Sequence, residues 1–349
     1  MAGTPQRILI VRPSALGDVC RSVPVLASLR RAFPAAQIDW LVQDTFAEAI
    51  SAHPALSGVV VFDRRRFGRW ASPASMGALA RWLRNLGRAN YDLVLDCQGL
   101  LRSAIFTQAT GAPRRIGHAD ARELAWAAYT DRVPPGSSPH TVDRMLQLAA
   151  AAGAPAVPDM RLYAPAAAAA VLFDREPRLA SGPLVIVAPT SRWPGKRWPA
   201  ARFAEVTRGM IAGARRGGPV VAVVGGARER DQCKPLLDLA ATEPRVVDLV
   251  GRTTVGELLA LIERASLVLA NDSAAVHMAV GFNRPLVAIY GPTDIARVGP
   301  YGRTQDVLSH TGPGDTLDHK DAERGLMLME RVPASDVLRG AMQRLGPQH

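Results

Sequence analysis

The sequence contains few cysteines and no long apolar run. Its three cysteines, Cys20, Cys97 and Cys233, are far apart, without CxxC spacing or neighbouring histidines, so neither a disulfide framework nor a zinc site is indicated. The N-terminal MAGTPQR lacks the apolar core of a signal peptide, and the longest apolar run, 164–173, is shorter than the roughly 20 residues of a membrane span. We therefore predict a cytoplasmic protein with no membrane-spanning segment.

Two ligand-binding motifs are also missing. The loop after the first expected strand, 8–11, offers only Gly17 where a dinucleotide-binding fold has GxGxxG, which argues against a phosphate at this turn. The chain has no DxD pair, so a divalent cation bridging a diphosphate to carboxylates is not indicated. The sequence thus favours a mechanism without a metal.

Length and charge favour a two-domain globular protein with anionic partners. At 349 residues the chain exceeds the roughly 100–200 residues of one domain. Hydrophobic residues make up 48% and charged residues 21%, as in globular proteins. The 42 Lys and Arg outnumber the 31 Asp and Glu, and the net charge of +11 favours nucleic acid, a phospholipid surface or a phosphorylated substrate.

Short β-branched runs alternate with helical periods, which is typical of βαβ units and a mostly parallel sheet. The strands expected in the first half are 8–11, 38–42, 59–62, 91–96 and 115–117, with helices at 21–32 and 76–88 among them. The strands expected in the second half are 184–189, 220–225, 246–250, 267–272 and 286–291. The predicted fold class is therefore α/β, with two similar layers in tandem.

A proline-punctuated, alanine-rich stretch at 155–183 separates these layers. We assign 1–160 to the first domain, 161–183 to the linker and 184–330 to the second domain; the tail, 331–349, includes a helical period at 334–345. Two doubly wound domains would form a cleft between their strand ends, where the ligands of such sheets bind. Strand-end loops are therefore the places to look for chemistry.

The loop after the first strand contains an acid, Asp18, where a phosphate-binding fold would have glycines. This carboxylate could simply interact with the dipole of the following helix, a contribution of about 0.3–1 kcal/mol. Alternatively, a carboxylate at a helix start facing a cleft could accept a proton from a substrate hydroxyl, as a general base. The sequence leaves both interpretations open.

The second domain has polar residues after two of its strands. The loop 188–199 places Thr190, Ser191 and Lys196 where hydroxyls and an ammonium group can meet phosphate oxygens, although a basic solvated loop is the commoner explanation. Asp272 and Ser273 lie where a strand gives way to a helix, whose free N–H groups form an anion site. His277 follows one helical turn later; a lone histidine is more often structural, so it counts only with these neighbours.

An arginine-rich stretch, DRRRFGRW at 63–70, follows the third strand. Its arginines are Arg64, Arg65, Arg66 and Arg69. Such a run is often only a solvated face, but its place on the same strand-end edge as Asp18 suits an anionic acceptor. A nucleic-acid-binding module would explain the charge but not Asp18 or the Asp272–Ser273 helix start, and no nucleic-acid motif is present, so we expect no nucleic-acid partner.

Together these motifs resemble glycosyltransferase family 9, and most closely the lipopolysaccharide heptosyltransferases. The resemblance covers nearly the whole chain and rests on the order and spacing of several pieces. They are the SALGDV loop (14–19), DCQGLLRSA (96–104), ARE (121–123), HTVDR (140–144), SRWPGKRWP (191–199), NDSAAVHMA (271–279) and GPTD (291–294).

The resemblance implies a GT-B fold, in which two Rossmann-like domains with parallel sheets face one another across a cleft, and the C-terminal helix crosses back onto the first domain. It also implies inverting, metal-independent transfer of a heptose from an ADP-activated donor to an anionic glycolipid, either Kdo-bearing lipid A or the first heptose of the core. No cofactor is needed beyond the ADP-sugar, a co-substrate. The enzyme would be cytoplasmic, with peripheral contact at the inner membrane face.

The resemblance also assigns roles to residues. Asp18 would be the base, and Lys196 would stabilise the departing nucleotide. The donor-binding residues would be Thr190, Ser191, Lys196, Glu229, Asp272, Ser273, Ala274 and His277. The acceptor-binding residues would be Ser14, Arg64, Arg65, Arg66, Arg69 and Arg102.

The chain departs from the family pattern at two places near the donor. Ala274 stands where the family usually has glycine, and the loop before Lys196 is one residue longer, with Pro194 and Gly195 in it. Both changes bear on the donor rather than on the fold. A family 9 transferase with another nucleotide sugar or acceptor, or a sugar-nucleotide 2-epimerase of the same architecture, is the alternative.

Overall fold

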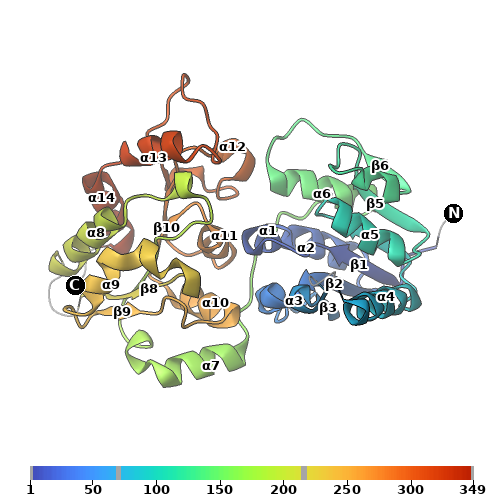
Figure 1. The fold of residues 1–349 in the computed structure, drawn as a ribbon, viewed down its shortest axis with the longest axis horizontal. Coiled ribbons are helices and arrows are strands. Elements are labelled where there is room, and N and C mark those ends of the chain that lie inside the picture. Colours follow the sequence, from blue (N-terminus) through green and yellow to red (C-terminus); the bar gives the residue numbers. More distant parts are fainter. Residues whose placement is uncertain (1–2, 68–71, 214–217, 347–349) are drawn as a thin grey trace. The chain divides into compact units, whose positions relative to one another are not determined.

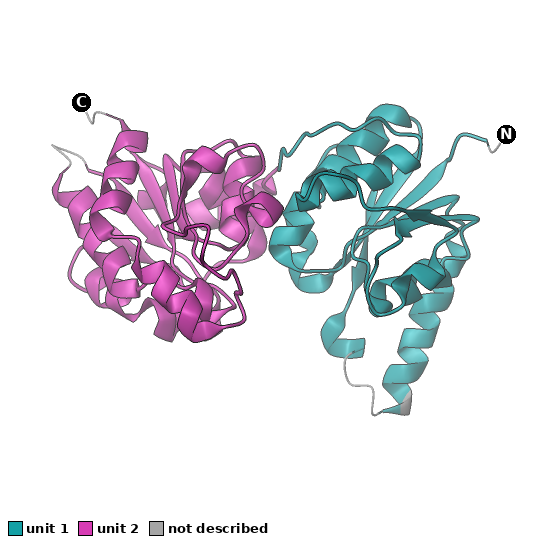
Figure 2. Ribbon diagram, turned by 90° about the horizontal axis from the view of Figure 1, so that it is seen from above, with its two compact units in different colours: residues 1–162 teal, residues 163–349 magenta. Residues whose placement is uncertain are grey.

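The computed structural model describes residues 3–67, 72–213 and 218–346, which fold into two α/β units (Figure 1). Unit 1 spans Met1–Leu162 and unit 2 spans Tyr163–His349 (Figure 2). The segment expected to be a linker belongs partly to unit 2, because helix α7 (Ala166–Arg175) lies in it and packs on helix α10 (Val255–Arg264). None of the helices in the described ranges is long and apolar enough to span a membrane.

Unit 1 contains a parallel six-stranded sheet in the order β3-β2-β1-β4-β5-β6. The strands are β1 (Arg7–Val11), β2 (Gln37–Gln43), β3 (Gly58–Phe62), β4 (Leu93–Asp96), β5 (Arg114–His118) and β6 (Asp131–Val133). The helices are α1 (Leu16–Arg21), α2 (Val23–Ala32), η1 (Asp44–Ala49), α3 (Arg64–Phe67), α4 (Pro73–Arg88), α5 (Leu101–Ala109), η2 (Ala125–Ala128) and α6 (Thr141–Ala151). Residues 8–11 of β1 are buried on both faces of the sheet, which explains their continuous apolar run.

Unit 2 repeats this plan with the order β12-β11-β10-β7-β8-β9, also parallel. The strands are β7 (Leu184–Ala188), β8 (Val220–Val223), β9 (Val246–Asp248), β10 (Leu267–Asn271), β11 (Leu286–Ile289) and β12 (Val307–Leu308). The remaining helices are η3 (Pro177–Leu179), η4 (Pro194–Lys196), α8 (Ala200–Ala212), η5 (Ala227–Cys233), α9 (Lys234–Ala240), α11 (Ala274–Gly281), α12 (Ile295–Val298), η6 (Thr304–Asp306), α13 (Ala322–Glu330) and α14 (Ala334–Leu345).

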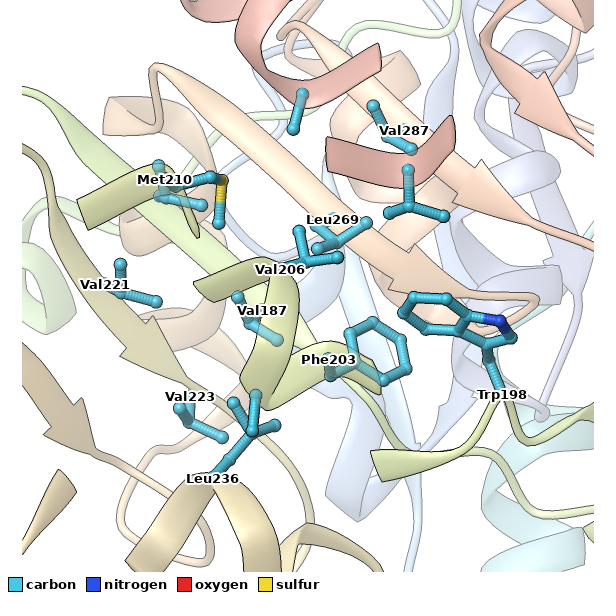
Figure 3. Packing of buried hydrophobic residues seen from close by; sticks show 14 of the residues in the cluster. Val187, Trp198, Phe203, Val206, Met210, Val221, Val223, Leu236, Leu269 and Val287 are labelled. Carbon is cyan, nitrogen blue, oxygen red and sulfur yellow. The ribbon is translucent and has the colours of Figure 1, made fainter. Parts of the chain in front are cut away.

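A core cluster of unit 2 lies between the sheet and helices α8, α9 and α14 (Figure 3). Trp198 and Phe203 pack edge to face in it, with ring centroids 4.9 Å apart. The indole N–H of Trp198 donates to the carbonyl of Val332 at 2.9 Å, so this side chain also satisfies its polar atom. Because Trp198 ends the loop after β7, the core holds that loop in place.

Most expected strands and the C-terminal helix are present, with three differences. The expected helix 21–32 is broken at Ser22, which caps α2 just before Pro24, and two short edge strands, β6 and β12, were not predicted. Helix α14 has the predicted bounds but buries Val337 and Ala341 against unit 2, where it contacts α8 and β11. The packing of this helix on the first domain, which the resemblance implies, stays a prediction.

The strand order changes direction between β1 and β4 in unit 1 and between β7 and β10 in unit 2. Loops that leave the carboxyl ends of two such strands run to opposite faces of the sheet and leave a crevice between them. The Asp18 loop follows β1, the Lys196 loop follows β7, and the Asp272–Ser273 pair follows β10. The topology therefore places the candidate residues of each unit at its ligand-binding edge.

Replacing Trp198 by alanine is expected to destabilise unit 2 by roughly 3–5 kcal/mol, because it empties a buried site in the core. Urea unfolding followed by circular dichroism measures this change. The matched control is Val171→Ala on α7, where the side chain is 59% exposed and the effect should stay within about 0.5 kcal/mol. Equal stability of the two variants would contradict the packing described for Trp198.

Candidate functional site

In unit 1, Asp18 lies in the first turn of α1 and is held by two arginines. Its carboxylate pairs with Arg12 at 3.1 Å and with Arg21, and it accepts the N–H of Ala15 at 3.3 Å. The side chain of Asp18 is 27% exposed, against 12% for Arg12 and 10% for Arg21. Asp18 therefore caps the start of its helix and still reaches solvent.

The two arginines are fixed by contacts on their far sides. Arg12 donates to the carbonyl of Cys97, just after β4, and Arg21 donates to the Thr141 hydroxyl at the start of α6 at 3.0 Å. Burial alone would raise the pKa of Asp18, but the charges of Arg12 and Arg21, with the hydrogen bonds, outweigh it and lower the pKa far below its ordinary value. The carboxylate is therefore ionised at neutral pH, the form that a proton acceptor needs.

Ser14 and Arg102 lie beside this cluster. The Arg102 guanidinium is 3.4 Å from the Ser14 hydroxyl, and the Ser14 N–H donates to the side chain of Gln98, after β4, at 3.3 Å. Burial and the nearby charge of Arg64 lower the pKa of Arg102, while Glu123 acts in the opposite direction. The structure thus brings Ser14, Arg102 and Arg64 to the edge of the sheet that contains Asp18.

The other arginines predicted to bind the acceptor lie on α3 or after it in the sequence. Arg65 and Arg66 are exposed on the short helix α3, and the Arg66 guanidinium lies 5.9 Å from the centre of the Phe67 ring. Arg69 falls outside the described residues, so its role stays a prediction. The sequence did not single out Arg12 or Arg21, although Arg21 is one helical turn from Asp18.

In unit 2, Asp272 contacts polar groups from the neighbouring loops at the point where the strand order reverses. Its carboxylate pairs with the Lys196 ammonium at 2.6 Å and accepts the Thr293 hydroxyl at 2.8 Å, while its carbonyl lies 3.4 Å from the Ser191 hydroxyl. Thr190 and Ser191 are buried in the loop after β7. The structure therefore brings together the three polar segments that follow β7, β10 and β11.

Asn271 fixes the two loops against each other. Its side-chain amide donates to the Pro189 carbonyl at 2.6 Å, and its amide oxygen accepts the N–H of Trp198 at 3.2 Å. The start of α11 lies next to it, where Ser273 is the N-cap without a side-chain capping bond, followed by Ala274 and then the buried His277. The first N–H groups of α11 and the Lys196 ammonium can thus serve an anion together.

Two further contacts define the surroundings of Lys196. A Cβ atom on Gly325 of α13 would lie 2.5 Å from the Cα of Gly195, so the Lys196 loop packs backbone to backbone on α13 at this glycine. Burial and the nearby charge of Lys196 lower the pKa of His319, while Asp318 and Asp272 act in the opposite direction. The His319 ring also packs edge-on against the Trp193 ring, with centroids 5.2 Å apart, which places His319 near this site.

Glu229 lies in η5, which follows β8, the strand next to β7. Its carboxylate accepts the N–H of Gly226 at 2.7 Å and so caps η5. Thr293 was not predicted as a site residue, because only the strand order places the loop after β11 beside β10. In the described part of the chain no group of three or more His, Cys, Asp and Glu side chains could hold a metal ion.

The family model of glycosyltransferase family 9 (heptosyltransferase) matches residues 79–326. Lipopolysaccharide heptosyltransferase 1 of Pseudomonas aeruginosa is 33% identical over 88% of this chain and 84% of its own length. The chain belongs to glycosyltransferase family 9. The resemblance is thereby confirmed, and this family 9 protein is an enzyme of the glycosyltransferase class.

Other relatives agree with this assignment. Lipopolysaccharide heptosyltransferase 1 of Salmonella typhimurium is 28% identical over 90% of this chain and 97% of its own. The solved structure of E. coli heptosyltransferase WaaC with ADP-2-deoxy-2-fluoro heptose is 26% identical, covers 93% of this chain and 99% of its own, and has a TM-score of 0.70. The structure of E. coli ADP-heptose lps heptosyltransferase II is 21% identical, covers 97% of this chain and 98% of its own, and has a TM-score of 0.78. This similarity confirms the GT-B fold of this family 9 member.

Replacing Asp18 by asparagine is expected to lower the stability of unit 1 by roughly 1–3 kcal/mol at pH 7, because charged hydrogen bonds to both arginines are lost. Asparagine keeps an oxygen for the Ala15 N–H, so the helix cap is retained. The pKa of Asp18 is lower in the folded state than the value of about 3.9 in the unfolded chain. Its contribution is therefore present above that value and is lost as the pH falls toward the folded-state pKa.

Thermal unfolding of the wild type and of Asp18→Asn, measured between pH 7 and pH 3, checks this prediction. The difference in stability should be largest near neutral pH and shrink on acidification. A difference that grows on acidification would show that the two arginines do not stabilise the ionised carboxylate.

Proposed function

We propose that this enzyme transfers a heptose from an ADP-activated donor to an anionic lipopolysaccharide core acceptor, either Kdo-lipid A or heptosyl-Kdo-lipid A. The observation that carries the proposal is the pair of polar clusters at matching strand switches. Unit 2 offers an anion site with Lys196, and unit 1 offers a partly exposed carboxylate, Asp18. The names of the relatives and the solved complexes with ADP and ADP-2-deoxy-2-fluoro heptose support the donor.

In unit 2, the donor diphosphate would replace the carboxylate as the partner of Lys196. The ammonium contacts Asp272 at 2.6 Å, and the Lys196 side chain is 14% exposed, so an entering phosphate would approach it from the solvent side. Thr190, Ser191, Ala274 and the start of α11 would supply hydroxyl and N–H donors, with His277 beside them and Glu229 toward the ribose. Asp272, still held by Thr293, would then lie close to the sugar.

In unit 1, Asp18 would act as the general base. As the acceptor hydroxyl oxygen bonds to the anomeric carbon, the bond from that carbon to the diphosphate breaks, the proton passes to the Asp18 carboxylate, and ADP leaves. A single displacement of this kind inverts the anomeric configuration. Lys196 and the α11 N–H groups meet the charge that develops on the leaving diphosphate, which supports a metal-independent reaction.

The arginines around Asp18 would link the binding of the acceptor to the basicity of the Asp18 carboxylate. Arg12 and Arg21 hold the pKa of Asp18 low, which weakens it as a base. An acidic group of the acceptor that pairs with Arg12 or Arg21 would relieve this effect when the hydroxyl arrives. We place the enzyme in the cytoplasm, in peripheral contact with the inner membrane that holds such an acceptor.

Replacing Asp18 by alanine is expected to lower kcat by about 10²–10⁴-fold, the usual contribution of general base catalysis, with donor affinity unchanged. A coupled assay of ADP release measures turnover, and calorimetry measures donor binding. Asp131→Asn is the matched control, since it removes a different arginine–carboxylate pair of unit 1, in which the Asp131 carboxylate lies 3.1 Å from the Arg114 guanidinium. Near-wild-type turnover of Asp18→Ala would rule out this role.

Calorimetry with ADP, UDP and GDP tests the donor, and we expect ADP to bind most tightly. Lys196→Ala should weaken ADP binding by roughly ten- to hundredfold, because it removes a charged partner of the diphosphate. Lys234→Ala is the control, because that lysine pairs with Asp238 on the exposed face of α9. Preference for UDP or GDP would indicate a family 9 transferase with another nucleotide sugar.

A further inference from the structure

We infer that unit 1 contacts the surface of an anionic phospholipid bilayer through three exposed apolar residues, Leu101, Ile105 and Leu124, and the arginines around them. This inference deepens the proposed function and rests on it for its biological purpose, since the proposed acceptor is a membrane lipid. The three residues are called the apolar surface below.

The apolar surface lies where α5 meets η2. Leu101 and Ile105 are one turn apart on α5, so they lie on the same face, and they are 53% and 43% exposed. Helix α5 packs on η2, with Ala104 and Ala125 buried between them. Leu124, the residue before η2, is 69% exposed. The carboxylate of the preceding Glu123 accepts the N–H of Leu101 at 3.0 Å, which fixes the Leu124 loop to the first turn of α5.

The backbone at Leu124 is strained. Glu123 and Leu124 have φ values of 56° and 61°, in the left-handed region, which bulky side chains rarely adopt. Elsewhere in the described ranges, the non-glycine residues with positive φ are asparagines, Asn90 and Asn283, for which this conformation is easier. Leu124 therefore has a strained backbone although its exposed side chain contributes little to the packing of this chain. Strain without a gain in packing points to a function outside the fold.

The charge around the apolar surface fits lipid phosphates. Arg102 follows Leu101 in α5, and the exposed Arg122 lies two residues before Leu124 and donates its N–H to the Gly99 carbonyl at 3.2 Å. Unit 1 has 19 arginines and no lysine against 12 carboxylates. The planar guanidinium binds phosphate through two parallel hydrogen bonds, and basic residues near an anionic leaflet add to the attraction of apolar side chains. The bilayer is thus a better match than an apolar protein partner.

The place of the apolar surface suits a membrane-bound acceptor. The loop 119–124 leaves the carboxyl end of β5, and α5 begins after β4, so both lie at the same edge of the sheet as Ser14 and Asp18. Arg102, next to Leu101, lies 3.4 Å from the Ser14 hydroxyl. A bilayer at the apolar surface would hold the head group of a lipid within reach of this edge.

Sedimentation with vesicles of phosphatidylglycerol and phosphatidylethanolamine tests the inference without donor or acceptor. The test variant combines Leu101→Gln, Ile105→Gln and Leu124→Asn, and the control combines Val171→Gln and Met327→Gln, which are 59% and 58% exposed in unit 2. We expect the test variant to partition at least about tenfold less than the wild type, and the control to match the wild type. High salt and pure phosphatidylcholine should weaken wild-type binding.

Three results would overturn the inference: no wild-type binding to the anionic vesicles, equal binding of the test variant, or wild-type self-association that the test variant loses. The last result would assign the surface to a second copy of the chain. Leu124→Asn alone checks folding, because asparagine tolerates the left-handed backbone and should keep or raise the melting temperature. A lower melting temperature would instead make Leu124 a structural residue.

Transfer assays separate this inference from the proposed function. The test variant should match the wild type with a deacylated, water-soluble acceptor and be slower with the same acceptor in vesicles. If the wild type uses neither acceptor, the proposed function fails, and the vesicle-binding result still decides the inference. Equal loss of activity with both acceptors would show that the three residues support the site itself and not a membrane contact.

Discussion

The reversal of strand order within each sheet is the constraint on which both candidate sites depend. At that point, neighbouring parallel strands send their loops to opposite faces, and a crevice opens at their carboxyl ends. In unit 1 the strands are β1 and β4, and Arg12 spans the gap between their loops by donating to the Cys97 carbonyl. In unit 2 they are β7 and β10, and Asn271 spans the gap by donating to the Pro189 carbonyl.

Each site also holds its charges in ion pairs. Asp18 is matched by Arg12 and Arg21, and Lys196 by Asp272. An unpaired charge in such a partly buried position would lower the stability of the fold, and the ion pairs avoid this cost when no substrate is bound. In the proposed reaction, the donor diphosphate would replace Asp272 as the partner of Lys196, and an acidic group of the acceptor would replace Asp18 as the partner of an arginine. Substrate binding would then change the charges around the reacting groups in each unit.

Much of the fold could be predicted from the sequence, because buried parallel strands such as β1 and β7 are continuous apolar runs. The edge strands β6 and β12 could not, since they are only three and two residues long. Asp18, Lys196 and Asp272 could be proposed as site residues because they lie in the loops and at the helix starts that follow such runs. Arg12 and Thr293 were missed because their roles depend on strand order and loop geometry, which residue spacing does not encode.

The proposed division of work between a proton acceptor in unit 1 and an anion site in unit 2 requires that both substrates be present for turnover. The most direct test is mass spectrometry of ADP-heptose incubated with the enzyme, with and without a deacylated core acceptor. The account predicts that the acceptor gains one heptose, that ADP appears in equal amount, and that the donor alone is stable. Conversion of ADP-heptose to an isomer or to free sugar without acceptor, at a rate comparable to transfer, would contradict it.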